Sequence, residues 1–151
     1  MKISIEKILE ELQVLPEYDT QIMLQVPQGQ TDPFYGIGRL ANWNHTEDEF
    51  IYPVFDIPYT NNILKELKMF RTRVMRMKPH RCYSYHVDET KRIHIPLITD
   101  EKCFFVLDDK VMRLPADGTH TLVDTTKMHT FVNASSIQRI HIVGCANEAI
   151  L

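Results

Sequence analysis

Residues 92–97 read Arg-Ile-His-Ile-Pro-Leu, and residues 139–143 read Arg-Ile-His-Ile-Val. Successive side chains of a β-strand point to opposite faces, so in each run the isoleucines share one face while the arginine and the histidine share the other. If the isoleucines pack into a core, Arg92, His94, Arg139 and His141 face either solvent or a polar cavity. A cavity requires partners for buried charge, because an unpaired buried guanidinium is very costly. A metal and an anionic ligand would supply those partners.

Short runs with a period of two continue on both sides of these segments, separated by turn signals such as Lys78-Pro79 and the Pro-Ala-Asp-Gly run at 115–118. Strands are predicted near residues 70–77, 82–87, 91–97, 103–107, 110–114, 120–124, 129–133 and 138–143. Strands at this spacing predict an all-β sandwich or barrel. The cupin-like jelly roll, or double-stranded β-helix, is the form whose mouth commonly holds a metal. An immunoglobulin-like sandwich is the alternative, but it gives no reason for the polar residues.

The first 69 residues are predicted to carry one or two short helices and a covering loop. The expected elements are a helix over about 5–13 capped by Ser4, a strand over 22–26, and a second helix over 60–68 capped by Thr60 or Asn61. Residues 27–38 contain three glycines and two prolines, which is typical of a mobile loop that could act as a lid. Trp43, the one tryptophan, is predicted to pack in the core, and the wall of a pocket is the alternative.

Composition sets the outer bounds. At 151 residues, with 44% hydrophobic and 25% charged residues, the chain is expected to form a single domain, with a helix and lid region at 1–69 and the jelly-roll core at 70–143. A formal charge of −3 is too small to argue for a nucleic-acid or membrane partner. The locally basic run is interpreted as a charged strand face; it comprises Lys68, Arg71, Arg73, Arg76, Lys78 and Arg81.

Cysteine usage and hydropathy bear on the compartment. The three cysteines are odd in number and include no Cys-x-x-Cys pair, which fits reduced thiols in a cytoplasm. No apolar run approaches the roughly 18 residues of a membrane span. We therefore expect a soluble, cytoplasmic protein.

A His-x-Asp pair, His86 and Asp88, precedes a distant second histidine, His129. This is the ligand pattern of the two-histidine, one-carboxylate facial triad, which binds Fe(II) and leaves positions open for oxygen chemistry. Arg139 follows His129 by ten positions and could anchor a dicarboxylate. Each motif alone is common, and surface histidines on an antiparallel sheet are the plain alternative. The order of the motifs and their positions on predicted strands favour a metal site.

The chain resembles the aspartyl/asparaginyl β-hydroxylase family of Fe(II)/2-oxoglutarate oxygenases, which includes proline cis-hydroxylase-like enzymes. The segments that carry the resemblance are 75–79, 86–88, 92–97, 129–136 and 139–141. The resemblance covers about residues 70–143. It implies a jelly roll in which His86, Asp88 and His129 bind iron and Arg139 pairs with the distal carboxylate of 2-oxoglutarate. Arg92 and His94 match the family's Arg-x-His pair, which lies against the other end of the cosubstrate. Where the peptide hydroxylases have a serine near the cosubstrate, this chain has Met75.

The function that the resemblance implies is hydroxylation of an aliphatic C–H bond with O2 and 2-oxoglutarate. The substrate would be an amino acid, either free and proline-like or an Asp, Asn or Pro residue in a protein. No catalytic side chain beyond the metal ligands is expected. The alternative is a non-catalytic, cupin-like module that binds a metal or a ligand. A nucleic-acid demethylase has only the basic run at 68–81 in its favour.

Overall fold

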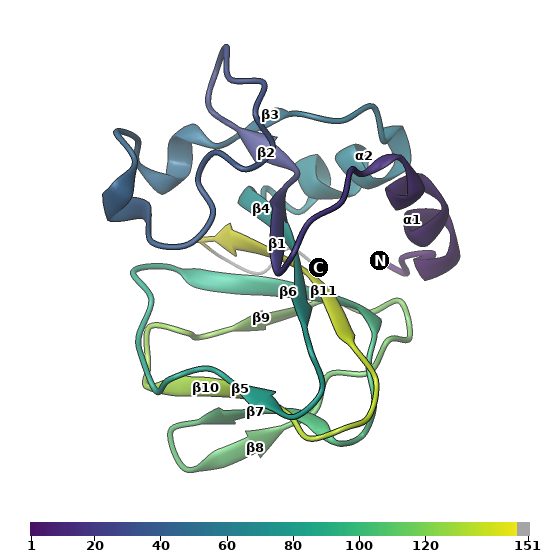
Figure 1. Cartoon of the computed structure of the whole chain (residues 1–151), viewed down its shortest axis with the longest axis vertical. Coiled ribbons are helices and arrows are strands. Elements are labelled where there is room, and N and C mark those ends of the chain that lie inside the picture. Colours follow the sequence, from purple (N-terminus) through teal and green to yellow (C-terminus); the bar gives the residue numbers. More distant parts are fainter. Residues whose placement is uncertain (148–151) are drawn as a thin grey trace.

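The computed structural model of the chain describes residues 1–147 and has two helices packed beside a pair of antiparallel β-sheets (Figure 1). The larger sheet has the order β1-β4-β11-β6-β9, and the smaller sheet has the order β5-β10-β7-β8. The strands are β1 (Gln21–Met23), β4 (Phe70–Met77), β5 (Arg81–Cys82), β6 (Lys91–Ile98), β7 (Cys103–Leu107), β8 (Lys110–Met112), β9 (Thr121–Val123), β10 (His129–Asn133) and β11 (Arg139–Ala146).

The strand order identifies the fold. If the strands from β4 to β11 are counted from one to eight in chain order, the two sheets read 1-8-3-6 and 2-7-4-5. Consecutive strands therefore alternate between the sheets, apart from the β7–β8 hairpin, as in a double-stranded β-helix or jelly roll. The predicted all-β jelly-roll core with short N-terminal helices is confirmed.

The outer face of the larger sheet packs against the helices. Ile93, Ile95 and Ile142 have no exposed surface and lie in one cluster with side chains of α1 (Ile5–Glu11) and α2 (Pro58–Glu66), including Ile8 and Leu64. Since β-strand side chains alternate, this packing turns the arginines and histidines of β6 and β11 toward the space between the sheets. The strand phase predicted from the two isoleucine runs is confirmed.

The N-terminal region departs from prediction in two places. Residues 22–26 form two strands in different sheets, because Leu24 between them donates its N–H to Thr72 and accepts at its C=O from Val54. The second strand, β2 (Gln25–Val26), pairs with β3 (Tyr52–Pro53). Helix α1 has the predicted Ser4 cap and continues into the 3-10 turn η1 (Leu12–Val14).

The predicted cap of the second helix is wrong. Helix α2 begins at Pro58, since proline at the first helical turn loses no hydrogen bond. The backbone N–H groups of Tyr59 and Thr60 donate to the carboxylate of Glu11, at 2.9 and 2.7 Å. A side chain of helix α1 thus accepts hydrogen bonds from the free backbone N–H groups in the first turn of α2.

The strand predicted at 82–87 is mostly absent. Regular pairing stops after Cys82, and within residues 83–90 only His86 rejoins the ladder, as an isolated antiparallel bridge to His129. The two residues exchange backbone hydrogen bonds of 3.0 Å in each direction. The bridge therefore places the two histidines opposite each other.

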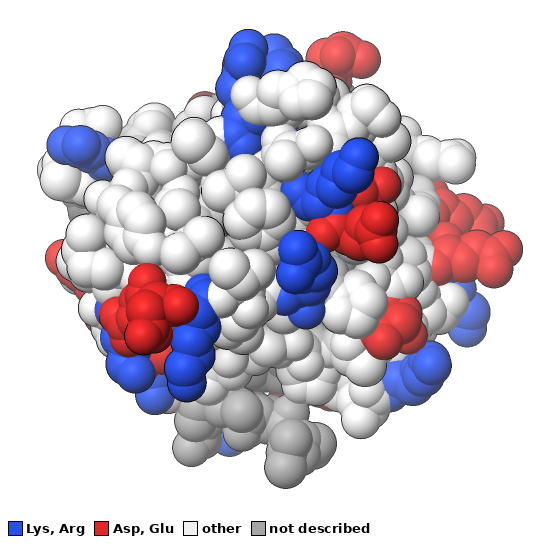
Figure 2. Space-filling view, turned by 90° about the horizontal axis from the view of Figure 1, so that it is seen from below, with Lys and Arg blue, Asp and Glu red and all other residues white. Residues whose placement is uncertain are grey.

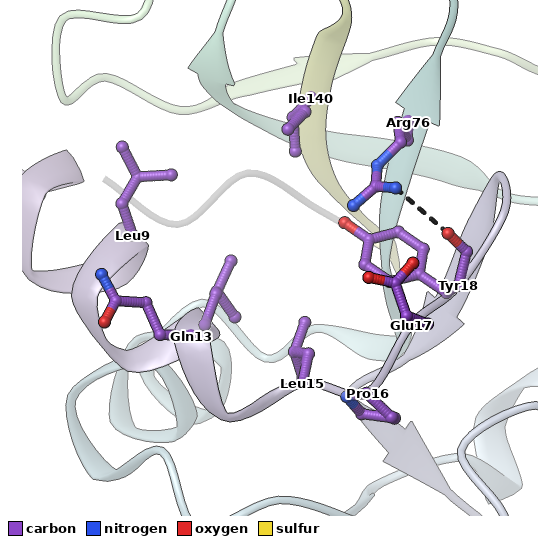
Figure 3. A pocket seen from close by; sticks show the side chains of 9 residues that line it. Leu9, Gln13, Leu15, Pro16, Glu17, Tyr18, Arg76 and Ile140 are labelled. Carbon is purple, nitrogen blue, oxygen red and sulfur yellow. Dashed lines mark hydrogen bonds between the residues drawn. The ribbon is translucent and has the colours of Figure 1, made fainter.

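The basic run does not form a charged strand face. Arg71 and Arg73 are 4% and 7% exposed and point inward from β4, whereas Arg76 lies on the outer face, 3.9 Å from the ring of Tyr18 (Figure 3). Arg76 there lines a hollow of about 220 Å³ beside η1. On the face seen in Figure 2, basic and acidic side chains are interspersed. Within residues 1–147 no helix combines the length and hydropathy needed for a membrane span.

Candidate metal centre

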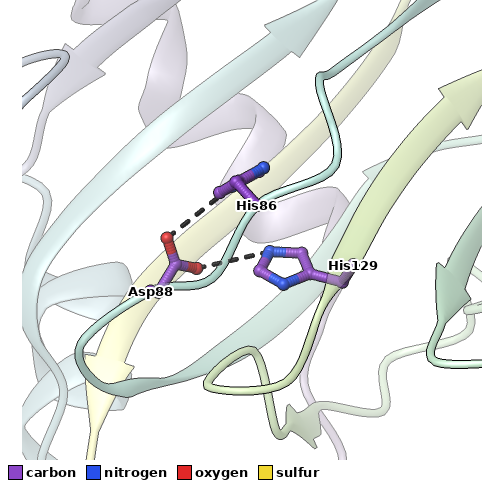
Figure 4. Close-up of side chains that lie close together, drawn as sticks. All are labelled: His86, Asp88 and His129. Carbon is purple, nitrogen blue, oxygen red and sulfur yellow. Dashed lines mark ion pairs between the residues drawn. The ribbon is translucent and has the colours of Figure 1, made fainter.

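His86, Asp88 and His129 converge at one point between the sheets (Figure 4). The Nε2 atoms of His86 and His129 lie 3.7 and 3.4 Å from the two oxygens of Asp88, and the three potential ligand atoms all lie within 4.8 Å of one another. With metal–nitrogen bonds of about 2.1 Å, neighbouring ligand atoms in a metal site are about 3 Å apart. A small inward movement of these side chains would close on a cation.

The hydrogen bonds of the two imidazoles fix which nitrogen faces this point. Nδ1 of His86 lies 2.7 Å from the carbonyl oxygen of Ser84, and Nδ1 of His129 lies 2.8 Å from that of Lys127. A carbonyl can only accept, so each Nδ1 carries the proton and donates. The Nε2 lone pairs are then free for a metal, and the backbone orients both rings, as second-shell partners do in metal sites.

The titration of the cluster favours the ligand form of Asp88. Burial alone would raise the pKa of Asp88, but the hydrogen bond from His129 and the charge of Arg92 hold it at about 2. Burial would lower the pKa of His129, but its hydrogen bonds with Asp88 and Lys127 raise it above the usual value. In the absence of a cation, His129 therefore holds its proton more tightly than a free imidazole does. A metal would replace that proton as the partner of Asp88.

The cluster lies on the wall of a cavity of about 870 Å³ between the sheets. Arg139, Arg92 and His94 line the same cavity. Arg139 is 1% exposed, and its Nε and Nη1 atoms have no hydrogen-bond partner within residues 1–147. Its guanidinium lies 4.2 Å from the ring of Phe131, and no carboxylate of residues 1–147 forms an ion pair with it. A buried cation with spare donors is suited to an anionic ligand.

His94 forms a buried pair with His141. Their Nδ1 atoms are 3.1 Å apart, and burial together with the charge of Arg139 lowers the pKa of both well below the usual value. Two neutral imidazoles in this contact need one donor and one acceptor, so the two rings take opposite tautomers at Nδ1. The pair thus orients His94 on the cavity wall.

Comparison with known proteins identifies the family. The family model described as aspartyl/asparaginyl beta-hydroxylase matches residues 5–144. The chain belongs to this family. The match also extends the similarity into the first 69 residues, beyond the core motifs that carry the resemblance in the sequence.

No curated protein matches the chain in sequence. Among solved structures, a cupin 2 conserved barrel domain protein from Salinispora arenicola CNS-205 is similar at 17% identity and a TM-score of 0.40, over 50% of this chain and 61% of that one. The DMSP lyase DddQ from Ruegeria pomeroyi DSS-3 is similar at 16% identity and a TM-score of 0.41, over 53% and 40%. The structure of Rhodobacter sphaeroides SigE in complex with the anti-sigma ChrR is similar at 13% identity and a TM-score of 0.36, over 50% of this chain and 38% of that one. The chain thus spans less than two thirds of the length of each of these.

In this member of the hydroxylase family, Arg92 is already engaged. Its Nη1 donates to Thr90, its Nη2 lies 3.1 Å from Glu47, and its Nε lies 3.8 Å from Asp88. These contacts involve at most four of the five N–H groups of Arg92, so one N–H of Nη2 is left for a cosubstrate. Its present contacts hold Asp88 beside the two histidines.

Some residues of the cavity were not predicted as site residues. Glu47 is 8% exposed and joins Arg71 to Arg92, while Arg73 lines the cavity from β4. Trp43 also lines the cavity, with its ring centroid 4.6 Å from that of Tyr35 and the two ring planes tilted by 57°, so its predicted place in the core is wrong. The alternation of 70–77 could have revealed Arg71 and Arg73, but Met75 and Met77 share their face and made the inner side of the strand ambiguous.

Proposed function

We propose that the chain is an Fe(II)- and 2-oxoglutarate-dependent oxygenase that hydroxylates an aliphatic C–H bond of an amino acid, free or within a protein. One observation carries the proposal. The His86–Asp88–His129 cluster shares a cavity with a buried guanidinium, that of Arg139, which has unused donors. An oxygenase of this class needs a metal and, next to it, a pocket for a dicarboxylate. Membership of a hydroxylase family supports the same chemistry.

The residues present suit ferrous iron. Two Nε2 lone pairs and one ionised carboxylate are the ligand set of non-heme Fe(II) oxygenases, whereas structural zinc sites prefer thiolates and a closed four-ligand shell. Fe(II) bound there would supply oxygen activation, with one atom of O2 oxidising 2-oxoglutarate to succinate and carbon dioxide and the other entering the substrate as hydroxyl. The protein supplies the positions and the surroundings for this chemistry.

Each remaining side chain then has a positioning task. Arg139 would hold the distal carboxylate with two parallel charge-assisted hydrogen bonds, and the ring of Phe131 against its guanidinium fixes the plane of that fork. His94, kept neutral and oriented by His141, offers a polar contact to the cosubstrate without adding charge. Phe105, Phe131 and Val143 give the cavity an apolar wall, which limits water around the reacting groups.

The direct test is turnover of 2-oxoglutarate. The purified protein with Fe(II) and O2 should convert 2-oxoglutarate slowly to succinate without any substrate, as followed by NMR. The matched control is His129→Ala at the same iron concentration, which should show only the background of free iron. A cupin-like module that only binds metal would bind Fe(II) and form no succinate above that background.

A further inference from the structure

Buried positive charge exceeds buried negative charge in the cavity. Four arginines with little or no exposed surface line it, namely Arg71, Arg73, Arg92 and Arg139. Glu47 forms ion pairs with Arg71 and Arg92, at 3.0 and 3.1 Å. Arg71 also donates to the carbonyl oxygens of Gly36 and Gly38. Within residues 1–147, Arg73 and Arg139 have no such carboxylate partner.

Arg73 is the less explained of these two. Its Nη1 lies 3.1 Å from Oε1 of Gln21, a neutral acceptor, and its Nε has no partner within residues 1–147. Burial and the neighbouring charges of Arg71 and Arg92 lower the pKa of Arg73 to about 10. The Arg73 guanidinium is therefore still a cation at neutral pH, although it is buried close to two other cations, Arg71 and Arg92. Burial of such a charge is costly unless an anion compensates it.

Arg73 and Arg139 cannot share one small dicarboxylate. Arg139 pairs with Met77 in the β4–β11 ladder, and Arg73 lies four residues from Met77 along β4. At about 3.3 Å per residue, the two backbone positions are about 13 Å apart. The four C–C bonds between the carboxylates of 2-oxoglutarate, each about 1.5 Å, span at most about 6 Å. Neither arginine is among the groups that shift the pKa of the other, so the two guanidiniums mark two separate anion positions.

Arg73 also lies level with His94, a cavity residue whose pKa is affected by the charges of His129 and Asp88 in the metal cluster. It pairs with Val143 of β11, which pairs with His94 of β6. Arg73 and His94 thus lie at the same level of the sheet, two strands apart. Arg139 lies at the level of Met77, four residues farther along β4. Gln21 and Met75 line the cavity beside Arg73. A ligand held there would face the cluster from the β4 side and leave the path to Arg139 open.

We propose that Arg73, with Gln21, forms a second anion subsite that binds a carboxylate of the prime substrate while Arg139 binds the cosubstrate. The naming of the ligand as the prime substrate depends on the proposed function, but the subsite itself does not. The carboxylate could be the α-carboxylate of a free amino acid or the side-chain carboxylate of an acidic residue, since both present the same planar anion to a guanidinium.

The test follows the arginine Nε–H signals of the ¹⁵N-labelled protein by NMR, with Zn(II) as a diamagnetic and oxygen-inert metal. The signals are assigned with Arg73→Lys, Arg139→Lys and Arg76→Gln. Acetate should shift the Arg73 signal in a saturable way, both with and without 2-oxoglutarate. In calorimetric titrations of acetate with 2-oxoglutarate present, Arg73→Gln should weaken acetate binding at least about tenfold, whereas Arg76→Gln, the same change on the outer face of the same strand, should leave it within about twofold.

The subsite is overturned if acetate shifts the Arg73 signal of the wild-type protein no more than that of Arg76. This comparison needs no variant at position 73, so it holds even if Arg73→Gln fails to fold. If acetate moves Arg73 but 2-oxoglutarate leaves Arg139 unmoved, the subsite stands and the proposed function fails.

Competition separates the two sources of the carboxylate. Displacement of acetate by L-proline, and not by L-prolinamide, assigns the α-carboxylate of a free amino acid. Displacement by aspartate blocked at both termini assigns a side-chain carboxylate of a polypeptide. If neither compound displaces acetate from Arg73, the site binds an adventitious ion only, and the substrate assignment is overturned.

Discussion

Oε2 of Glu47 lies 3.1 Å from Nη2 of Arg92, and this ion pair ties the turn η3 (Glu47–Glu49) to strand β6. The same oxygen lies 3.0 Å from Nη1 of Arg71, so one carboxylate forms ion pairs with two buried guanidiniums. Since Arg92 also faces Asp88, the pair connects the covering segment of the N-terminal region with the candidate metal centre.

Replacement of Glu47 by glutamine should therefore destabilise the protein. Removing one partner of a buried ion pair leaves the other charge uncompensated, which costs about 3–5 kcal/mol in the free energy of unfolding. Urea denaturation followed by circular dichroism measures this. Glu101→Gln, at an exposed position, is the control and should change the free energy by less than about 0.5 kcal/mol. Equal unfolding midpoints for Glu47→Gln and the wild type would show that the ion pair contributes nothing to stability.

The contribution of Glu47 should also depend on pH. Burial alone would raise its pKa, but the charge of Arg92 and hydrogen bonds with Cys145, Arg71 and Thr90 bring it below the usual 4.5. A carboxylate with a lower pKa in the folded state contributes stability above its unfolded pKa and loses it as the pH falls through the folded pKa. The stability difference between wild type and Glu47→Gln should be constant from about pH 8 to 5 and shrink below about pH 4.5. Urea titrations across that range measure it, and a difference that grows on acidification would contradict the lowered pKa.

Alternation of side chains was sufficient to predict the inner faces of β6 and β11, because each strand has isoleucines on one face and an arginine and a histidine on the other. The same rule failed for β4, where methionines occupy the cavity side together with Arg71 and Arg73. Glu47 lies in a short 3-10 turn with no periodic pattern, so its contacts with strands 24 and 45 residues away depend on tertiary packing alone. His86 was predicted on a regular strand, yet a single bridge to His129 positions it.

Alanine at His86, Asp88 or His129 should remove metal binding and leave the domain folded. The three side chains contribute little apolar burial, so their loss should change core packing little. Second-shell changes alone cost 10–100-fold in metal affinity, so loss of a ligand should cost more than about 100-fold. Calorimetric titration of Mn(II), with circular dichroism to confirm folding, measures this.

The control for the three ligand variants is His80→Asn, an exposed histidine outside the cluster. His80 has a φ of 58°, a conformation that asparagine tolerates better than alanine does. His80→Asn should bind Mn(II) as the wild type does. Normal metal binding by any one of the three alanine variants would remove that residue from the ligand set.

Arg139→Ala should weaken 2-oxoglutarate binding much more than metal binding. Arg139 shares the cavity with the cluster but lies beside Phe131, away from Asp88, and its contacts include none of the three candidate ligands. Loss of a charge-assisted bidentate contact should cost about 2–5 kcal/mol, or about 30-fold or more in affinity, because the cosubstrate carboxylate is left buried and unpaired. Calorimetric titration of 2-oxoglutarate into the Mn(II)-loaded, oxygen-inert protein measures this without turnover.

Two further variants separate the fork of Arg139 from its charge. Arg139→Lys should recover only part of the affinity, because a point charge cannot reproduce two parallel hydrogen bonds in one plane. Arg76→Ala removes an equal charge from the outer face of the neighbouring strand, where Arg76 packs on Tyr18, and should leave the affinity unchanged. If Arg139→Ala binds 2-oxoglutarate as tightly as the wild type, the guanidinium is not the anchor. The protein would then be a metal-binding jelly roll in which Arg139 binds an anion other than 2-oxoglutarate.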